Sequence, residues 1–163
     1  MNLETQIDIV TQKEIELPDG RLKQVAALVH RRSLSGLEVL LITSRGTGRW
    51  VLPKGWPQKG KSLARSALSE AREEAGVRGW LSSEPIGTFC YEKPPEDKSP
   101  AQAFCVDVFA LQFVRQDERW PEQAVRDLEW VAPHEAAARV VEPDLKALLR
   151  RFAEEGPGSG PVS

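Results

Sequence analysis

Hydrophobic and polar residues alternate along several short stretches of the chain, a pattern that is typical of strands with one buried face. Two aliphatic runs, 24–30 and 37–44, are separated by the segment RRSLSG and predict a β-hairpin. Further strands are expected at 49–53 and at 128–133, and a long one at 103–114. The stretch WLSSEPIGTFCYEK, between these, is expected to hold one or two more.

Apolar residues change to helical spacing after the third predicted strand. They form an alanine-rich stripe over 62–75, with Ser62 as a suitable N-cap and Gly76 as a suitable stop. The preceding segment KGWPQKGK (54–61) contains glycine and proline and is expected to be a loop. Helix is also expected over 134–155, whose second part places apolar residues on one side: Leu145, Leu148, Leu149 and Phe152.

The order of these elements predicts one domain of the α/β (α+β) class, a sandwich with a central mixed β-sheet. A chain of 163 residues with 40% hydrophobic content can build one such core. Residues 1–23 are expected to form an N-terminal extension in which QIDIV and KEIEL supply an edge strand. The domain is expected to cover 24–153, followed by a Gly/Pro/Ser-rich disordered tail over 154–163.

Two classes of protein are disfavoured by composition. The longest apolar runs, near 39–42 and 104–114, are far shorter than the ~20 residues of a membrane span. The N-terminus lacks the pattern of a secretory signal, so a cytoplasmic location is expected. Cys90 and Cys105 have neither CxxC spacing nor a nearby histidine cluster. They are expected to be reduced and packed, and zinc is not expected.

The net charge of −2 does not predict a nucleic-acid partner, and no specific nucleic-acid binding is expected. The distribution of charge says more, because no acidic residue lies between Glu38 and Glu70. That interval contains only basic charges, at Arg45, Arg49, Lys54, Lys59, Lys61 and Arg65. They precede an acidic cluster, which indicates an anionic ligand held partly by cations and partly through a metal. A solvated basic face balanced by acids elsewhere fits the charge count equally well.

The acidic cluster consists of Glu70, Glu73 and Glu74, which share one side of the predicted helix within an arc of ~100°. Carboxylate oxygens suit Mg²⁺, which commonly bridges protein acids to substrate phosphates. The helix N-terminus and the lysines before it favour phosphate. An ordinary exposed acidic face, with Arg72 as a partner, is the alternative.

The segment GWPQKGKSLARSALSEAREEAGV (55–77) resembles the Nudix box, G-x5-E-x7-R-E-U-x-E-E-x-G-U, in which U is apolar. The matching positions are Gly55, Glu70, Ala71, Glu73, Glu74, Gly76 and Val77. Lys61 and Ser69 stand where the pattern has its first Glu and its Arg, a paired change of charge. Over the wider range 24–152, the chain resembles the diphosphoinositol polyphosphate phosphohydrolase branch of the family.

The resemblance implies a Nudix-type α/β/α sandwich that hydrolyses a nucleoside diphosphate derivative or a related pyrophosphate. It implies that Glu70, Glu73 and Glu74 are the catalytic acids and hold Mg²⁺, or Mn²⁺ in its place, together with the main-chain carbonyl of Lys54. Glu70, or a residue of another loop, would orient the attacking water. Expected substrate-binding residues are Arg45, Arg49, Lys54, Gly55, Lys59 and Lys61.

The function predicted from the sequence is therefore a Mg²⁺-dependent pyrophosphohydrolase acting on a phosphorylated small molecule. A phosphate-rich substrate, such as a diphosphoinositol polyphosphate or a dinucleoside polyphosphate, suits the basic approach to the acids. A nucleotide-sugar or nucleoside triphosphate hydrolase is the first alternative. The second is a Nudix-like binding domain without catalysis, suggested by the changes at Lys61 and Ser69. The sequence does not predict the oligomeric state.

Overall fold

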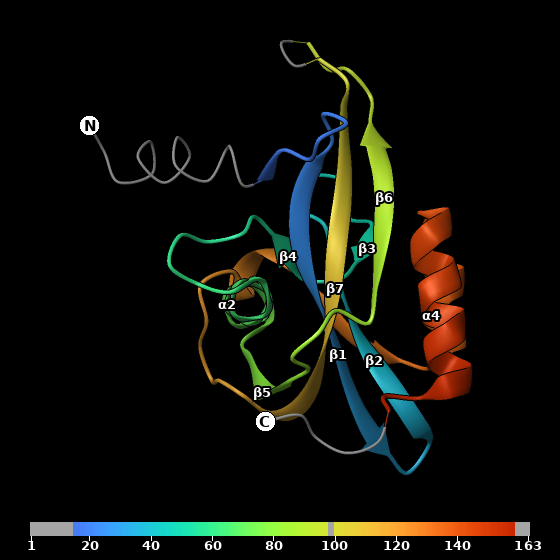
Figure 1. The fold of residues 1–163 in the computed structure, drawn as a ribbon. Helices are drawn as coiled ribbons and strands as arrows, with labels where there is room; N and C mark the ends of the chain where they lie inside the picture. The colour runs from blue at the N-terminus through green and yellow to red at the C-terminus, as the bar shows by residue number, and fades with distance from the viewer. Residues whose placement is uncertain (1–14, 98–99, 159–163) are drawn as a thin grey trace.

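The computed structural model describes residues 15–97 and 100–158, which form one mixed sheet between helices (Figure 1). The strands and helices follow one another in an order close to the predicted one. In chain order they are β1 (Leu22–Ser33), β2 (Gly36–Thr43), β3 (Trp50–Val51), β4 (Lys54–Gly55), α2 (Leu63–Ala75), β5 (Val77–Leu81), β6 (Gly87–Lys93), β7 (Gln102–Gln116), the 3-10 helix η1 (Gln123–Val125), β8 (Leu128–Val131), α3 (Pro133–Arg139) and α4 (Pro143–Glu155).

The sheet is built around β1 and β7, the long parallel pair at its centre. The main path runs β3-β2-β1-β7-β5, and the other strand pairs are antiparallel. One edge of β1 pairs with β4 at Val25 and Ala26 and with β2 further along, from His30. Similarly, β7 pairs first with β6 and then with β5. The sheet therefore forks on both sides of its central pair.

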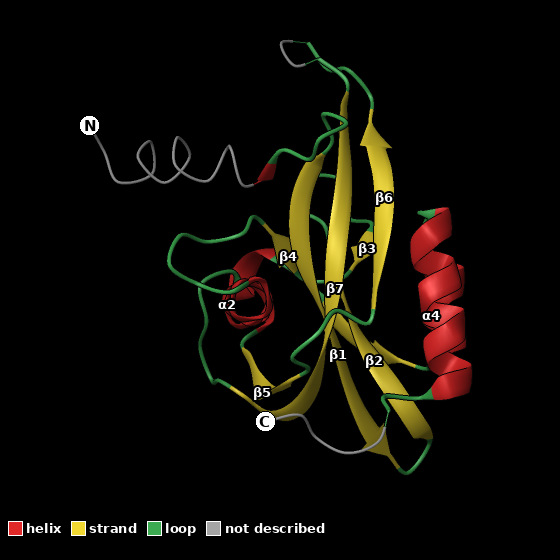
Figure 2. Ribbon diagram, viewed as in Figure 1, coloured by secondary structure: helices red, strands yellow, loops and turns green. Residues whose placement is uncertain are grey.

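Helices cover both faces of this sheet, with α2 on one side and α4 on the other (Figures 1 and 2). Side chains of β1 alternate between the two layers, because successive residues of a strand point to opposite faces. Val25, Ala27 and Val29 pack toward α2, whereas Ala26 and Leu28 belong to the core beneath α3 and α4. The predicted α/β/α sandwich with a mixed sheet is confirmed.

Helix α2 has the termini that its sequence predicts. The Ser62 side chain accepts a hydrogen bond from the Arg65 amide at 3.2 Å, which caps the first turn. Gly76 ends the helix at φ +70°, and a side chain there would also collide with the Trp120 ring. Between these ends a fully buried stripe lets the helix approach the sheet closely, and it consists of Ala67, Ala71 and Ala75.

The predicted strands are confirmed, although β1 and β7 are longer than expected, and β3 and β8 are shorter than the expected 49–53 and 128–133. Both β1 and β7 extend past their predicted bounds, because as central strands they find hydrogen-bond partners on both edges. The expectation of an irregular loop from residue 54 is wrong for Lys54–Gly55, which pair with β1 as β4. Helix α4 continues to Glu155, past the domain end expected at 153.

The termini lie largely outside the described residues. This applies to most of the edge strand expected within 1–23, where the described part contributes one isolated bridge between Glu16 and Leu22. It also applies to the end of the expected tail, 159–163. Within residues 15–97 and 100–158, no helix combines the length and apolar character that crossing a bilayer requires.

The expectation of two reduced cysteines is wrong, because Cys90 and Cys105 form a disulfide. They are direct partners in the antiparallel pair of β6 and β7, with a Cα–Cα distance of 4.1 Å. Directly opposite residues of an antiparallel pair lie close enough for such a bond. The spacing of the two residues in the sequence gives no sign of this register.

The disulfide makes a prediction about thiol content. Iodoacetamide added to denatured, unreduced protein is expected to modify neither cysteine, and to modify both after treatment with dithiothreitol. The double variant Cys90→Ser/Cys105→Ser is expected to lose about 3 kcal/mol of unfolding free energy, as for a loop of this length. Mass spectrometry and urea unfolding measure the two quantities. Alkylation of both residues without a reductant would contradict the disulfide.

His30 makes a prediction about stability at low pH. Its ring packs against Phe152 with centroids 5.5 Å apart, and only 7% of the residue is exposed. Burial, reinforced by the charge of Arg32, lowers the pKa of His30 to about 4 from an ordinary value of 6.5. The unfolded chain therefore binds a proton more readily between these values. The contribution of His30 is complete above pH 6.5 and falls by about 3 kcal/mol as the pH drops to 4.

Urea unfolding of the protein and of His30→Gln, at pH 7 and at pH 5, measures this contribution. The variant is expected to lose less stability between the two pH values than the parent protein. Comparing the change with pH, rather than the stability itself, cancels the packing that the substitution removes. Equal losses in the two proteins would contradict the prediction.

Candidate active site

A cleft of about 900 Å³ lies where the loop between β2 and β3, the β6 strand and the chain before α4 come together. Three of the predicted substrate-binding cations, Arg45, Arg49 and Lys54, line it together with Glu74. The Arg45 and Arg49 side chains are exposed, and within the described part of the chain they form no ion pair. This cleft therefore combines unengaged cations with one of the acids of the box.

Glu74 is held at the cleft by the strand next to its helix. Only 6% of the residue is exposed, and its Oε1 accepts a hydrogen bond from the Lys54 backbone amide at 3.2 Å. Its Oε2 lies 3.7 Å from Nη2 of Arg126. Burial raises the pKa of Glu74 to about 7, although Arg126 and the Lys54 amide favour the charged form. The acid is thus fixed in place and poorly hydrated.

Glu70 lies one helical turn earlier, beside the backbone of β4. A Cβ atom on Gly55 would collide with the Glu70 carboxylate, so the glycine of the box is what admits this acid. Burial raises the pKa of Glu70 to about 8, and the nearby negative charges of Glu74 and Glu73 add to the effect. Glu70 and Glu74 therefore form a pair of desolvated acids that repel each other.

Glu73 lies in different surroundings from the other two acids. It is exposed and lines a separate hollow of about 250 Å³, together with Ser69 and Trp120. Within residues 15–97 and 100–158, no set of three acidic, histidine or cysteine side chains is arranged to hold a metal ion. The predicted three-acid cradle is therefore not closed in this arrangement of the side chains.

The chemistry of Glu70 and Glu74 nevertheless fits a hard divalent cation. Both supply carboxylate oxygens, the ligands that Mg²⁺ prefers. Burial raises the pKa of both acids, and nearby negative charges, Glu74 for Glu70 and Glu122 for Glu74, add to the effect. A cation would offset both causes. Of the three acids predicted to bind the metal, Glu70 and Glu74 are the two that lie near each other in poorly hydrated surroundings.

Arg126 is a partly buried residue of the cleft that the sequence reasoning missed. Its Nη2 lies 2.8 Å from Oε1 of Glu122, and its Nη1 donates to the Thr43 carbonyl at 2.9 Å. The guanidinium thus connects the strand β2, the 117–127 segment and Glu74 of the helix. The i,i+4 spacing of Glu122 and Arg126 was the only signal in the sequence, and solvated pairs share that spacing.

A second missed residue, Gln24, fixes the side chain of Lys54. The Lys54 ammonium donates to Oη of Tyr91 at 3.0 Å and to Oε1 of Gln24 at 3.4 Å. Tyr91 donates to the same Gln24 oxygen at 2.8 Å, and its ring stacks on Phe104. Lys54 therefore contributes both its backbone amide, to Glu74, and a positioned ammonium to the cleft.

The remaining predicted substrate contacts lie elsewhere. Gly55, Lys59 and Lys61 are not among the residues that line the cleft. Lys61 instead donates from Nζ to Oγ of Ser69 at 2.8 Å. The two positions that depart from the box are therefore bonded to each other, in agreement with a single paired change.

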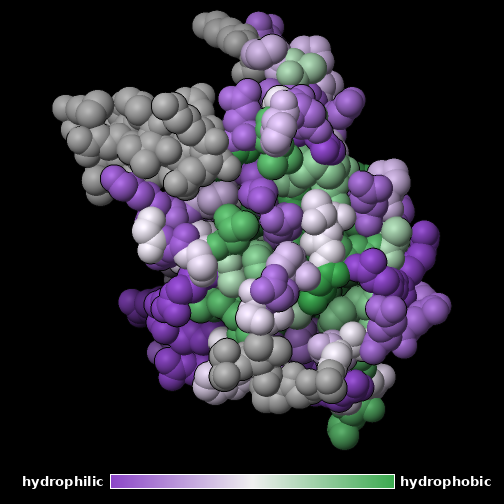
Figure 3. Space-filling model, viewed as in Figure 1, coloured by the Kyte–Doolittle hydropathy of each residue, from purple (hydrophilic) through white to green (hydrophobic). Residues whose placement is uncertain are grey.

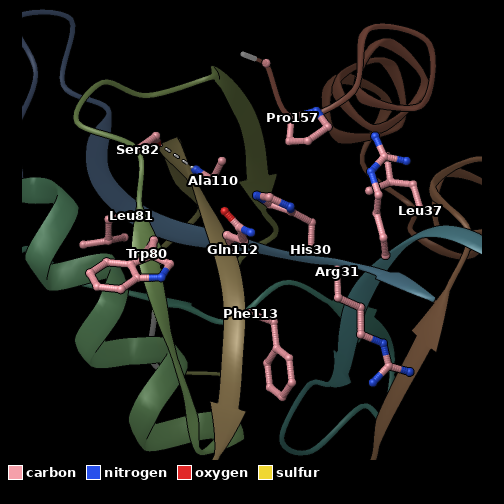
Figure 4. A pocket seen from close by; sticks show the side chains of 12 residues that line it. His30, Arg31, Leu37, Trp80, Leu81, Ser82, Ala110, Gln112, Phe113 and Pro157 are labelled. Carbon is pink, nitrogen blue, oxygen red and sulfur yellow. Dashed lines mark hydrogen bonds between the residues drawn. The ribbon is translucent and has the colours of Figure 1, made fainter. Parts of the chain in front are cut away.

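A further hollow, of about 700 Å³, opens near the other end of β1 and contains none of the predicted site residues (Figure 4). Trp80, Gln112 and His30 line it, with Pro157 at its rim. The Ser82 hydroxyl beside it is engaged, since it accepts from the Ala110 amide at 3.0 Å. The face drawn in Figure 3 shows hydrophobic surface at its middle with hydrophilic residues around it. This hollow contains Arg31 and Arg32 but, unlike the larger cleft, no acidic residue lines it.

Comparison with known proteins agrees with this arrangement. The family model described as NUDIX domain matches residues 20–155. Nudix hydrolase 13, mitochondrial, of Arabidopsis thaliana is 32% identical over 131 residues, which cover 74% of this chain and 63% of that protein. Human diphosphoinositol polyphosphate phosphohydrolase 3-alpha is 27% identical over 121 residues, covering 73% and 69% of the two chains. The chain spans about half the length of two other Arabidopsis relatives.

Solved structures share the fold. An Ap4A hydrolase from C. elegans, solved as a binary complex, superposes with a TM-score of 0.60 at 20% identity, over 81% of this chain and 95% of the other. The match of the family model extends across nearly all of the described sheet and helices, and the box occupies the helix and strand at which Glu70 and Glu74 meet Gly55 and Lys54. The chain therefore belongs to the Nudix family.

Proposed function

We propose that this protein is a pyrophosphohydrolase that cleaves a phosphoric anhydride in a phosphate-rich small molecule. A diphosphoinositol polyphosphate or a dinucleoside polyphosphate is the proposed kind of substrate. One observation carries the proposal, namely that buried Glu74 shares a cleft with Arg45, Arg49 and Lys54. Membership of a family whose named relatives are hydrolases supports an enzymatic role.

The cations of the cleft supply positive charge for the substrate phosphates and hold the substrate in position. Arg45 and Arg49 approach the substrate phosphates from an exposed loop, and the Lys54 ammonium approaches from the side held by Gln24 and Tyr91. Positive charges set in place before the reaction stabilise the charge that develops on a phosphoryl group. The chain thus orients the anhydride next to its buried acids.

A divalent cation, Mg²⁺ or Mn²⁺, is proposed as the cofactor. Glu70 and Glu74 would hold it, with Glu73 and the Lys54 carbonyl as further ligands. When bound, such an ion lowers the pKa of a bound water and screens phosphate charge. The positions of Glu70 and Glu74 beside β4 support this assignment, because each acid is already fixed against the backbone of Lys54 or Gly55.

Turnover of a panel of phosphorylated compounds tests the proposal. Phosphate release from the panel is expected to require Mg²⁺ and to fall about 100-fold in Glu74→Gln, near the upper end of losses for groups that support a metal site. Glu84→Gln, an equivalent change in an exposed loop, is the matched control and is expected to keep full activity. Binding of a panel compound without turnover, unaffected by Glu74→Gln, would instead support a non-catalytic binding domain.

Although Lys61 does not line the cleft, it is proposed as a contact for a phosphate group that extends beyond the cleft, and its bond to Ser69 provides the control for that idea. Lys61→Met and Ser69→Ala both remove the 2.8 Å hydrogen bond, but only the first removes a positive charge. Lys61→Met is expected to raise the KM about 10-fold with kcat retained, a loss of about 1.4 kcal/mol. Ser69→Ala is expected to leave KM unchanged. Steady-state kinetics distinguish the cases, and equal effects of both variants would reduce Lys61 to a structural role.

A further inference from the structure

The guanidinium of Arg126 places a positive charge among the acids of the cleft. Its Nη2 lies 3.7 Å from Oε2 of Glu74, and the two side chains are only 10% and 8% exposed. Burial raises the pKa of Glu70 as well, and the charge of Arg126 acts on that acid in the opposite direction. Both acids proposed as metal ligands therefore lie in the field of a cation that belongs to the chain itself.

Contacts other than the one with Glu74 fix the position of Arg126. Its Nε and Nη2 each lie 2.8 Å from Oε1 of Glu122, and its Nη1 donates to the Thr43 carbonyl at 2.9 Å. The next residue, Asp127, exchanges two hydrogen bonds with Thr43. The Asp127 amide donates to the Thr43 hydroxyl at 2.8 Å, and the Asp127 carbonyl accepts from the Thr43 amide at 3.0 Å. The guanidinium is therefore expected to stay in place when Glu74 binds another cation.

This fixed charge has opposite effects on the empty and the occupied site. Without a metal ion, it offsets part of the cost of burying the Glu74 carboxylate. With an ion on Glu74, it lies 3.7 Å from an oxygen of the carboxylate that holds the ion. Two cations on one carboxylate repel each other, and the repulsion is stronger where water is scarce. Arg126 thus favours the empty site over the occupied one.

We infer that Arg126 is a built-in counter-ion of the acid site, which stabilises the folded chain without metal and lowers the affinity of the site for a divalent cation. The inference rests on the proposed function, because Glu70 and Glu74 are the proposed ligands. It assigns control of the ion concentration at which the site fills to a residue that is not itself a ligand. A purely geometric role, in which Arg126 holds Glu74 in the orientation that an ion needs, predicts the opposite change in affinity when Arg126 is replaced.

Binding of Mn²⁺ alone, measured by electron paramagnetic resonance without substrate, tests the inference. Arg126→Met and Arg126→Gln both remove the charge, and the glutamine amide still provides hydrogen-bond donors. Each of these neutral variants is expected to bind Mn²⁺ about 10-fold more tightly than the parent protein, because the repulsion is gone. Arg126→Lys keeps the charge and is expected to keep the parent Kd.

Arg150→Met is the matched control for the loss of a positive charge. Arg150 is exposed on α4, which covers the face of the sheet opposite α2 (Figure 1). Exposed charges far from a site are screened by solvent and salt. This variant is therefore expected to bind Mn²⁺ with the parent Kd.

Thermal unfolding provides a second readout. In EDTA, the Tm of both neutral variants is expected to fall below that of the parent protein, because Glu74 and Glu122 lose their counter-ion. Addition of Mg²⁺ is expected to raise the Tm of these variants by more than it raises the parent Tm, since a tighter ligand stabilises the folded state more. If a neutral variant is unfolded in EDTA, Mg²⁺ is expected to restore its folded circular dichroism spectrum.

Several results would overturn the inference. They are weaker or unchanged Mn²⁺ binding by the neutral variants, tightening by Arg126→Lys equal to theirs, and a neutral variant that Mg²⁺ does not refold. Absence of Mn²⁺ binding in the parent protein and in both neutral variants would overturn it as well. A parent protein that binds Mn²⁺ but hydrolyses none of the phosphorylated compounds contradicts only the proposed function, and the comparison of Kd values then still decides the role of Arg126.

Discussion

A hydrogen bond of 3.2 Å, from the backbone amide of Lys54 to the carboxylate of Glu74, joins the helix α2 to the forked sheet. It requires Lys54 to be part of a strand, and pairing with Ala26 of β1 provides that constraint. It also requires α2 to lie close to the sheet, which the buried alanines of its inner stripe allow. Glu74 and the backbone of Lys54 take their positions at the cleft from this connection between helix and strand.

The same closeness has an electrostatic consequence. Glu70 and Glu74 lose hydration where the helix meets β4, and each holds its proton to higher pH than an ordinary glutamate. Arg126 offsets part of this cost at Glu74 but is itself shared with Glu122. Desolvated acids of this kind lower the stability of the folded protein, a compromise found at many functional sites.

Local features of the sequence predicted the elements well. The ends of α2 depend on Ser62 and Gly76, which act within one turn and can be recognised directly in the sequence. The alternation of hydrophobic and polar residues predicted the strands. The resemblance to the Nudix box agreed with the helix that carries the acids. Glu73 shows the limit of such reasoning, because sharing a helix side with Glu74 did not place it in the same hollow.

What the sequence missed depends on contacts between distant segments. The Cys90–Cys105 bond follows from the register of β6 and β7, and the role of Gln24 depends on Tyr91, far along the chain. Arg126 likewise takes its position from Thr43, which lies far from it in the sequence.

The disulfide has a mechanical consequence for the cleft. It closes the chain between Cys90 and Cys105 into a covalent ring, and the cleft wall at Tyr91 belongs to that ring. Separation of β6 from β7 that starts at the connecting end of the hairpin cannot pass beyond the crosslink. Thermal opening from that end is thereby confined to residues within the ring. The β6–β7 pairs on the other side of the crosslink keep their hydrogen bonds.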